Sequence, residues 1–124
     1  MANFLDQFKE DIKSNVPGFI AVSVTEVATG VCYVSLSEKS DFDPELASAY
    51  NLEVVKAKYK AIEALGLKSK LQDIIITLSD QLHMIDVSDN GEYFIYLAVD
   101  SSSANLGTTR ALLKKYKKNI ASEL

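Results

Sequence analysis

The sequence has 124 residues, of which 48% are hydrophobic and few are Gly or Pro, so its composition is that of a compact globular chain rather than a disordered one. Its net charge of −4 argues against nucleic acid as the main partner, and no stretch approaches the roughly 20 apolar residues of a membrane span. With a single cysteine, Cys32, and no apolar leader at the N-terminus, we expect a cytoplasmic protein without membrane insertion.

The N-terminal third predicts a helix followed by a β-hairpin. Residues 3–14 place apolar side chains at the spacing of an amphipathic helix, and the Pro-Gly pair that follows ends it. Residues 19–27 and 31–37 are rich in β-branched side chains, as strands are, and the Ala-Thr-Gly turn between them makes them a hairpin.

A second helix is bounded by local signals at both ends. The Asp43 carboxylate can accept the first free N–H groups of a helix, and Pro44 has its φ angle preset for the first helical position. The helix is expected to run to about Leu65, because Gly66 supplies a C-terminal stop.

Three strands and a final helix follow. Residues 71–79, 81–88 and 92–100 read as strands, and residues 104–122 as a helix. The last strand is apolar on both faces, which is typical of the middle of a sheet covered by helices on each side. We therefore predict an α/β (α+β) fold: a single five-stranded, mostly antiparallel sheet with helices on both faces, in the order α-β-β-α-β-β-β-α.

The middle helix carries two apolar stripes. The first is assigned to the domain's own sheet and comprises Leu46, Ala47, Tyr50, Val54, Ala57, Ala61, Ala64 and Leu65. The second comprises Leu52, Val55, Tyr59 and Ile62, with the spacing by which one helix packs against another. Because a helix that lies on a sheet needs only one apolar face, we predict that the second stripe forms the interface of a homodimer.

The strand at 71–79 supports the same prediction. Its Ile74 and Ile76 would be an aggregation hazard on an unpaired edge, and a dimer would cover them. The predicted interface is therefore Leu52, Val55, Tyr59, Ile62, Ile74 and Ile76, and Val55→Asp is expected to give a monomer. The alternative is that a neighbouring loop or the first helix covers the second stripe.

Candidate catalytic groups are few. The one Cys–His pair, Cys32 with His83, is expected to be far apart in the predicted strand order, and His83 reads as an ordinary half-buried strand residue. Motifs of zinc proteases, zinc ribbons, P-loops and dinucleotide sites do not occur. We therefore predict no enzymatic activity, no cofactor and no metal.

The segment VDSSSANLGTTR, residues 99–110, joins the last strand to the last helix. One of its three serines is expected to cap that helix, and Gly107 in the first turn indicates either close packing or a φ angle that requires glycine. A helix N-terminus can hold an anion, but neither a lysine nor a glycine-rich loop accompanies this one. The segment is therefore interpreted as a structural junction in preference to a phosphate site.

The last helix is a positive element on an acidic body. Residues 104–124 contain five of the thirteen basic residues and a single acidic one. Arg110, Lys114, Lys117 and Lys118 share one helix face, and Leu106, Leu113, Tyr116 and Ile120 the other. The basic face is either a solvated surface whose cations suit the helix C-terminus or a docking surface for an acidic partner.

The element order, the PGF-IAVSV run at the first strand and the Asp100…Asn105-Leu106-Gly107…Arg110 run resemble the roadblock family of dynein light chains and their bacterial relatives. The resemblance covers residues 3 to 120 and implies one roadblock-like (profilin-like) domain, 1–124. The first hairpin turn departs from the family's more usual Asp-Gly, and the loop at 37–43 is somewhat long, which leaves the subfamily open.

The resemblance implies a homodimer in which the middle helices pair and the third strands join two sheets into one. Family members are scaffolds and regulators: bacterial ones partner or activate small Ras-like GTPases, and eukaryotic ones bind dynein intermediate chains or anchor GTPases at membranes. We expect a regulator of a small GTPase. The alternatives are an adaptor in a motor or other assembly without a GTPase, and a ligand-sensing or enzymatic domain with a pocket near Cys32, Tyr33 or Ser101.

Overall fold

The computed structural model describes residues 2–124 and has one five-stranded sheet. The elements are α1 (Ala2–Asn15), β1 (Phe19–Glu26), β2 (Cys32–Ser37), α2 (Pro44–Ala64), β3 (Asp73–Thr77), β4 (Gln81–Val87), β5 (Tyr93–Asp100) and α3 (Leu106–Glu123). The strand order is β2-β1-β5-β4-β3, and every pairing is antiparallel. The predicted fold class is confirmed.

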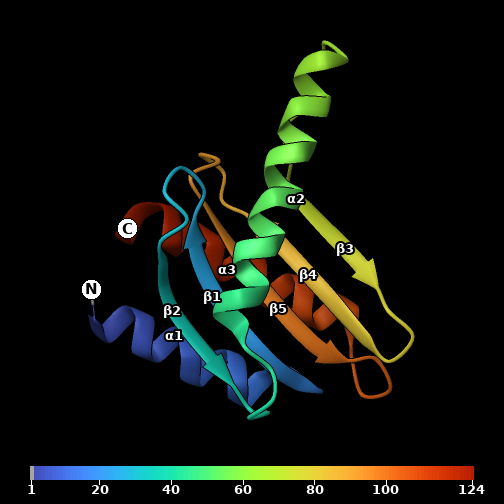
Figure 1. Ribbon diagram of the computed structural model, residues 1–124. Coiled ribbons are helices and arrows are strands. Elements are labelled where there is room, and N and C mark those ends of the chain that lie inside the picture. Colours follow the sequence, from blue (N-terminus) through green and yellow to red (C-terminus); the bar gives the residue numbers. More distant parts are fainter. Residues whose placement is uncertain (1) are drawn as a thin grey trace.

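Strand β5 lies in the middle of the sheet and separates two hydrophobic layers. Its odd-numbered side chains, such as Ile95 and Leu97, pack with α1 and α3 on one face. Its even-numbered side chains, such as Phe94 and Tyr96, pack with α2 on the other. Figure 1 shows α1 and α3 on the side of the sheet opposite α2. The prediction of a central strand with two buried faces is therefore correct.

Helix α2 extends well past the sheet that supports it. Its N-terminal half crosses the strands, and its C-terminal half projects from the body of the molecule (Figure 1). The ends are as predicted: Asp43 accepts the N–H groups of Glu45 and Leu46, and Gly66, with a φ of 67°, follows the last turn. Side chains from Glu63 to Lys70 are all exposed.

The two stripes of α2 lie opposite to the prediction. Leu52 and Val55, expected at a dimer interface, are 7% and 0% exposed and pack on the sheet. Leu46 and Tyr50, expected on the sheet, are 57% and 71% exposed. The sheet-facing stripe also includes a serine, Ser48, which is buried in a hydrogen bond with Ser23 of β1. The Ser23–Ser48 hydrogen bond therefore attaches α2 to the sheet, and a search for apolar stripes does not reveal it because both residues are polar.

The junction before α3 is capped by an asparagine and not by a serine. The Asn105 side chain accepts the N–H of Thr108 at 3.0 Å, and the helix begins at Leu106. Ser102 donates instead to the Asp100 carboxylate, through its N–H at 2.9 Å and its hydroxyl at 2.7 Å. The predicted serine cap is therefore wrong, because Asp100 holds the serines in a turn ahead of the helix.

Candidate functional site

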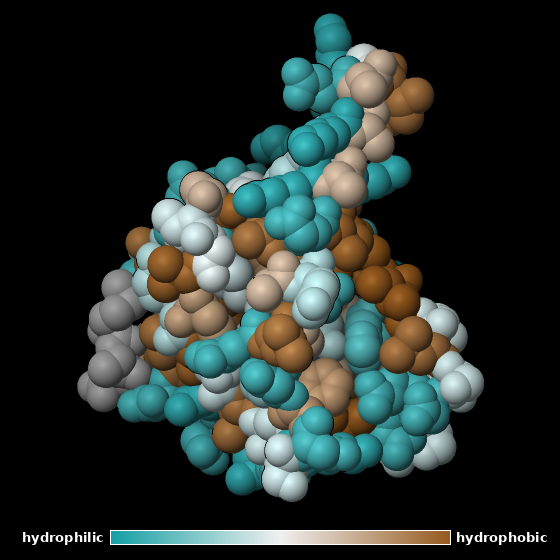
Figure 2. Space-filling view, viewed as in Figure 1, coloured by the Kyte–Doolittle hydropathy of each residue, from teal (hydrophilic) through white to brown (hydrophobic). Residues whose placement is uncertain are grey.

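An apolar groove runs between the exposed stripe of α2 and the edge strand β3. It has a volume of about 540 Å³ and is lined by Val54, Ala57, Lys58, Ala61, Leu71, Asp73 and Ile74. We call it the α2–β3 groove. Figure 2 shows hydrophobic surface along the flank of α2 on the β3 side. Strand β3 pairs only with β4 among the described residues, so its outer edge is open beside the groove.

The residues predicted for a dimer interface fall in several places. Ile74 lines the groove, whereas Ile76 packs half-buried beneath α2. Tyr59 and Ile62 line a separate depression near the turn between β4 and β5. Together with the burial of Leu52 and Val55, this leaves Ile74 as the one predicted residue that lines the groove.

The groove residues that the prediction missed belong to the first stripe of α2. Val54, Ala57 and Ala61 share one helix face, and Leu71 joins them from the segment before β3. Their signal in the sequence is an apolar stripe at helical spacing, which the sequence analysis predicted to lie on the protein's own sheet. Ala57 and Ala61 are small, so the backbone of another helix can approach closely here.

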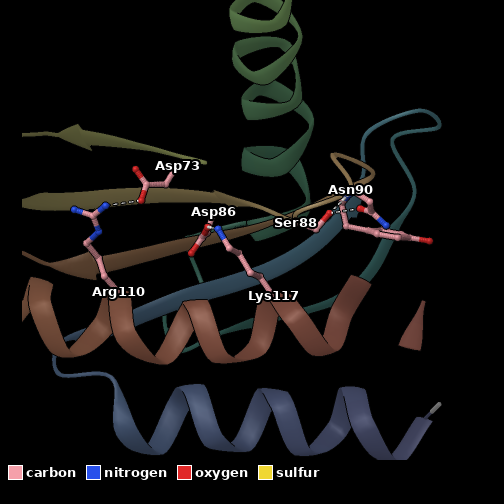
Figure 3. A network of polar contacts seen from close by, with 7 residues as sticks. Asp73, Asp86, Ser88, Asn90, Arg110 and Lys117 are labelled. Carbon is pink, nitrogen blue, oxygen red and sulfur yellow. Dashed lines mark hydrogen bonds and ion pairs between the residues drawn. The ribbon is translucent and has the colours of Figure 1, made fainter. Parts of the chain in front are cut away.

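Two of the five basic side chains on α3 are paired within the chain (Figure 3). The Arg110 guanidinium lies 2.7 Å from the Asp73 carboxylate, and the Lys117 ammonium lies 3.0 Å from Asp86. Lys117 and Asp86 are both buried, and burial raises the pKa of the Asp86 carboxyl although Lys117 opposes the shift. Neither alternative drawn from the sequence, a solvated face or a docking surface, therefore applies to Lys117.

The remaining lysines of α3 surround a shallow groove. Lys114, Lys115 and Lys118 are exposed, and they line a depression of about 450 Å³ whose other walls are Gln72, Asp89, Ala111 and Lys117. No carboxylate within 4.0 Å of the three exposed ammonium groups occurs in the described part of the chain. We call these three residues the α3 lysine cluster. They give an acidic protein a local positive surface.

Cys32 and His83 do not form a catalytic pair. Cys32 is on β2 and His83 on β4, with β1 and β5 between them, as predicted. Burial raises the pKa of the Cys32 thiol, and nearby Glu45 adds to the shift. The thiol is therefore less ionised than an ordinary cysteine at neutral pH, and less nucleophilic for that reason.

A smaller pocket lies at the N-terminal end of α2. Its volume is about 320 Å³, and its walls include Phe42, Tyr50, His83 and Tyr96. We call it the aromatic pocket. None of Cys32, Tyr33 and Ser101 lines it. The third alternative from the sequence, a ligand-sensing or enzymatic domain, placed its pocket near those residues. Within residues 2–124, no three His, Cys, Asp or Glu side chains are grouped to hold a metal ion.

Known structures share this arrangement of helices and strands, although comparison of the sequence alone finds no relative. No protein-family model and no curated protein matches the sequence. The Roadblock/LC7 domain from Streptomyces avermitilis superposes with a TM-score of 0.74, covering 99% of this chain and 92% of that one at 10% identity. The chain has the roadblock fold.

Two other roadblock-fold structures are similar to this chain. MglB of Myxococcus xanthus has a TM-score of 0.77 at 12% identity and covers 97% of this chain and 84% of its own. An MglB described with a tetrameric arrangement has a TM-score of 0.76 at 13% identity, with coverage of 98% and 87%. At these identities the likeness is one of fold.

In residues 2–124, no helix is both long and apolar enough to cross a bilayer.

Proposed function

We propose that the protein is a non-catalytic homodimeric regulatory or scaffold module that binds and regulates a small Ras-like GTPase. The observation that carries the proposal is the α2–β3 groove, an exposed apolar surface beside an open strand edge on a roadblock fold. Exposed apolar patches of this kind mark protein–protein contacts in soluble proteins. The resemblance of the sequence to bacterial GTPase partners supports the choice of partner.

The first contact that the groove favours is a second copy of the chain. Covering Val54, Leu71 and Ile74 contributes only part of the roughly 1.5–3 kcal/mol that full burial of such a side chain provides, because Val54 is 38% exposed and the other two are already partly buried. Pairing β3 with its symmetry mate satisfies the free backbone groups of the edge. The tetrameric arrangement described for one MglB supports self-association of this fold.

The dimer interface proposed here differs from the one that the sequence predicts. It is centred on Val54, Ala57, Ala61 and Ile74, and it excludes Leu52 and Val55, which are committed to the protein's own sheet. Val55→Asp would therefore unfold the chain instead of producing a folded monomer. Arg110 and Lys117 are likewise set aside as docking residues, since their charges are already neutralised by Asp73 and Asp86.

The α3 lysine cluster is the docking surface we propose for an acidic segment of the partner. It lies on the face of the sheet opposite α2, so it stays accessible when the groove is covered. Attraction between this cluster and an acidic segment weakens as salt rises, because exposed charges are screened beyond about 8 Å at physiological ionic strength.

The function is tested by affinity capture from native lysate, with the lysate loaded with either a GTP analogue or GDP, and identification of partners by mass spectrometry. A small GTPase captured preferentially in one nucleotide state supports the proposal. The same partner in both states, or a partner that is not a GTPase, replaces it with the adaptor function. The variant Lys114→Glu/Lys118→Glu should lose most of the captured partner, whereas Lys60→Glu, an exposed lysine on α2, should not.

A further inference from the structure

The aromatic pocket has no part in the contacts proposed above. It lies between the loop that precedes α2, the first turns of α2 and strands β4 and β5. The rings of Phe42 and His83 meet edge to face at 6.2 Å, and those of His83 and Tyr96 do so at 5.4 Å. Each ring is thus braced by the next, which gives the pocket a rigid wall.

Burial favours the neutral form of His83 in that wall by lowering its pKa, although the nearby charge of Asp80 opposes the shift. The Nε2 of His83 lies 2.8 Å from the Oε1 atom of Gln81, which only accepts, so Nε2 carries the proton. Its Nδ1 then accepts the hydroxyl of Tyr96 at 3.1 Å. The wall therefore presents aromatic surface without a positive charge that would repel a cation.

The free polar groups of the pocket include a carboxylate and an amide oxygen, which accept, and the exposed Tyr50 hydroxyl, which can accept as well as donate. Asn51 uses its Nδ2 to donate to the carbonyl of Ala47 at 2.8 Å, which leaves its side-chain oxygen available. Asp41 is exposed and has no hydrogen bond or ion pair among the described residues. No lysine or arginine lines the pocket. A ligand that matches this surface carries several donors and a positive charge.

Asp43 offsets the one unfavourable feature for a cation. The N-terminus of α2 carries a partial positive charge at the pocket's edge. Asp43 caps it, with Oδ1 accepting the N–H groups of Glu45 at 3.0 Å and Leu46 at 3.1 Å. The helix end is thereby compensated, and Asp41 remains as the anionic partner for a ligand.

We propose that the aromatic pocket binds an arginine side chain of a partner protein. A guanidinium group stacks on aromatic faces and has five donors for acceptors such as Asp41 and the Asn51 oxygen. The first turns of α2 line the pocket and later turns line the α2–β3 groove, so a partner can occupy the pocket beside the proposed dimer contact. The pocket lies within one protomer, and its binding of arginine does not depend on the dimer or on a GTPase.

The test is a titration of the isotope-labelled protein with Nα-acetyl-arginine amide, followed by ¹H–¹⁵N NMR. Saturable shifts at Phe42, Asn51 and His83 are expected. The matched control is Nα-acetyl-citrulline amide, which has the same shape without the charge and should produce no saturable shift. Equal shifts with citrulline, or none with arginine, would overturn the proposal.

Variants connect the binding to the pocket. Asp41→Asn should weaken arginine binding by about 5-fold or more, since it removes the charge that faces the guanidinium. Asp89→Asn, another exposed acid at a different site, should leave it unchanged. Unchanged binding by Asp41→Asn would contradict the proposal. The titration is also repeated with Ala57→Glu, a variant expected to be monomeric. Shifts that occur only in this variant would likewise contradict the proposal, because they would mean that the second copy covers the pocket in the dimer. Failure to capture a GTPase leaves these outcomes unaffected.

Discussion

Among single residues, the buried pair Asp86–Lys117 shows how little of a charged side chain's role is visible in its position on a helix. Lys117 lies on the basic face of α3, yet it is 8% exposed and bonded to a carboxylate 31 residues away. A buried pair of this kind stabilises less than its geometry suggests, because both charges lose their hydration. Removing one partner alone is far more costly, since it strands the other charge.

The pH dependence of stability should reveal this pair. The pKa of Asp86 is raised in the folded state, chiefly by burial, so the folded protein binds this proton more tightly than the unfolded chain does. Stability from this group is therefore present below the unfolded pKa and is lost as pH rises through the folded one. Urea unfolding measured from acidic to neutral pH should show wild type losing stability relative to Asp86→Leu/Lys117→Met as the pH rises.

The single variant serves as the control for that experiment. Asp86→Leu should cost about 3–5 kcal/mol at pH 7, because it leaves the Lys117 ammonium buried without the carboxyl oxygen that accepts its hydrogen bond, whereas the double variant should be close to wild type. A double variant as unstable as the single one would show that the packing of these side chains, and not their charge, is what matters.

Gly18 allows the backbone at the start of β1 to lie close to the backbone at the end of β5. Its φ is 76°, and a Cβ atom there would lie 2.9 Å from the carbonyl oxygen of Asp100. Gly66 has a similar φ of 67° with nothing within 4 Å. We expect Gly18→Ala to cost about 2–4 kcal/mol and Gly66→Ala about 1 kcal/mol. Urea unfolding of both variants measures the difference, and equal costs would mean that the Asp100 contact relaxes freely.

At the scale of elements, helix α2 contributes most of the proposed contact between two copies of the protein. Its exposed stripe contains Ala57, which lines the α2–β3 groove. Ala57→Glu should abolish the dimer, because a carboxylate would be buried at the centre of an apolar contact. Light scattering coupled to size exclusion measures the mass, and Ala49→Glu, an exposed alanine on another face of α2, should remain dimeric. A wild type that is monomeric at micromolar concentration would rule out the dimer.

The same helix marks the limit of what its sequence could predict. Its ends were predicted because Asp43, Pro44 and Gly66 act on their immediate neighbours. Its orientation was not, since both stripes are apolar and the choice between them depends on contacts distant in sequence, such as that of Ser48 with Ser23. Local signals therefore determine where a helix starts and stops, whereas the sheet determines which face it buries.

For the whole molecule, the sheet and its layers follow from strand patterns, but the candidate sites do not. The two apolar faces of β5 predicted its central position correctly. The aromatic pocket joins Phe42, Tyr50, His83 and Tyr96 from four separate segments, and no spacing in the sequence indicates that they meet. The α3 lysine cluster was partly predicted, because the sequence shows which lysines share a face and not which of them find a carboxylate.

The projecting half of α2 has a consequence for how the chain responds to its own concentration. Isolated helices shorter than about 12–15 residues are marginal in water, and this half has little of the molecule to pack against. In a lone protomer its amide protons should exchange with solvent well before those of the sheet. In the proposed dimer, a second copy would order this half, so part of the folding free energy would be gained only on association, and protection of these amides would rise with protein concentration.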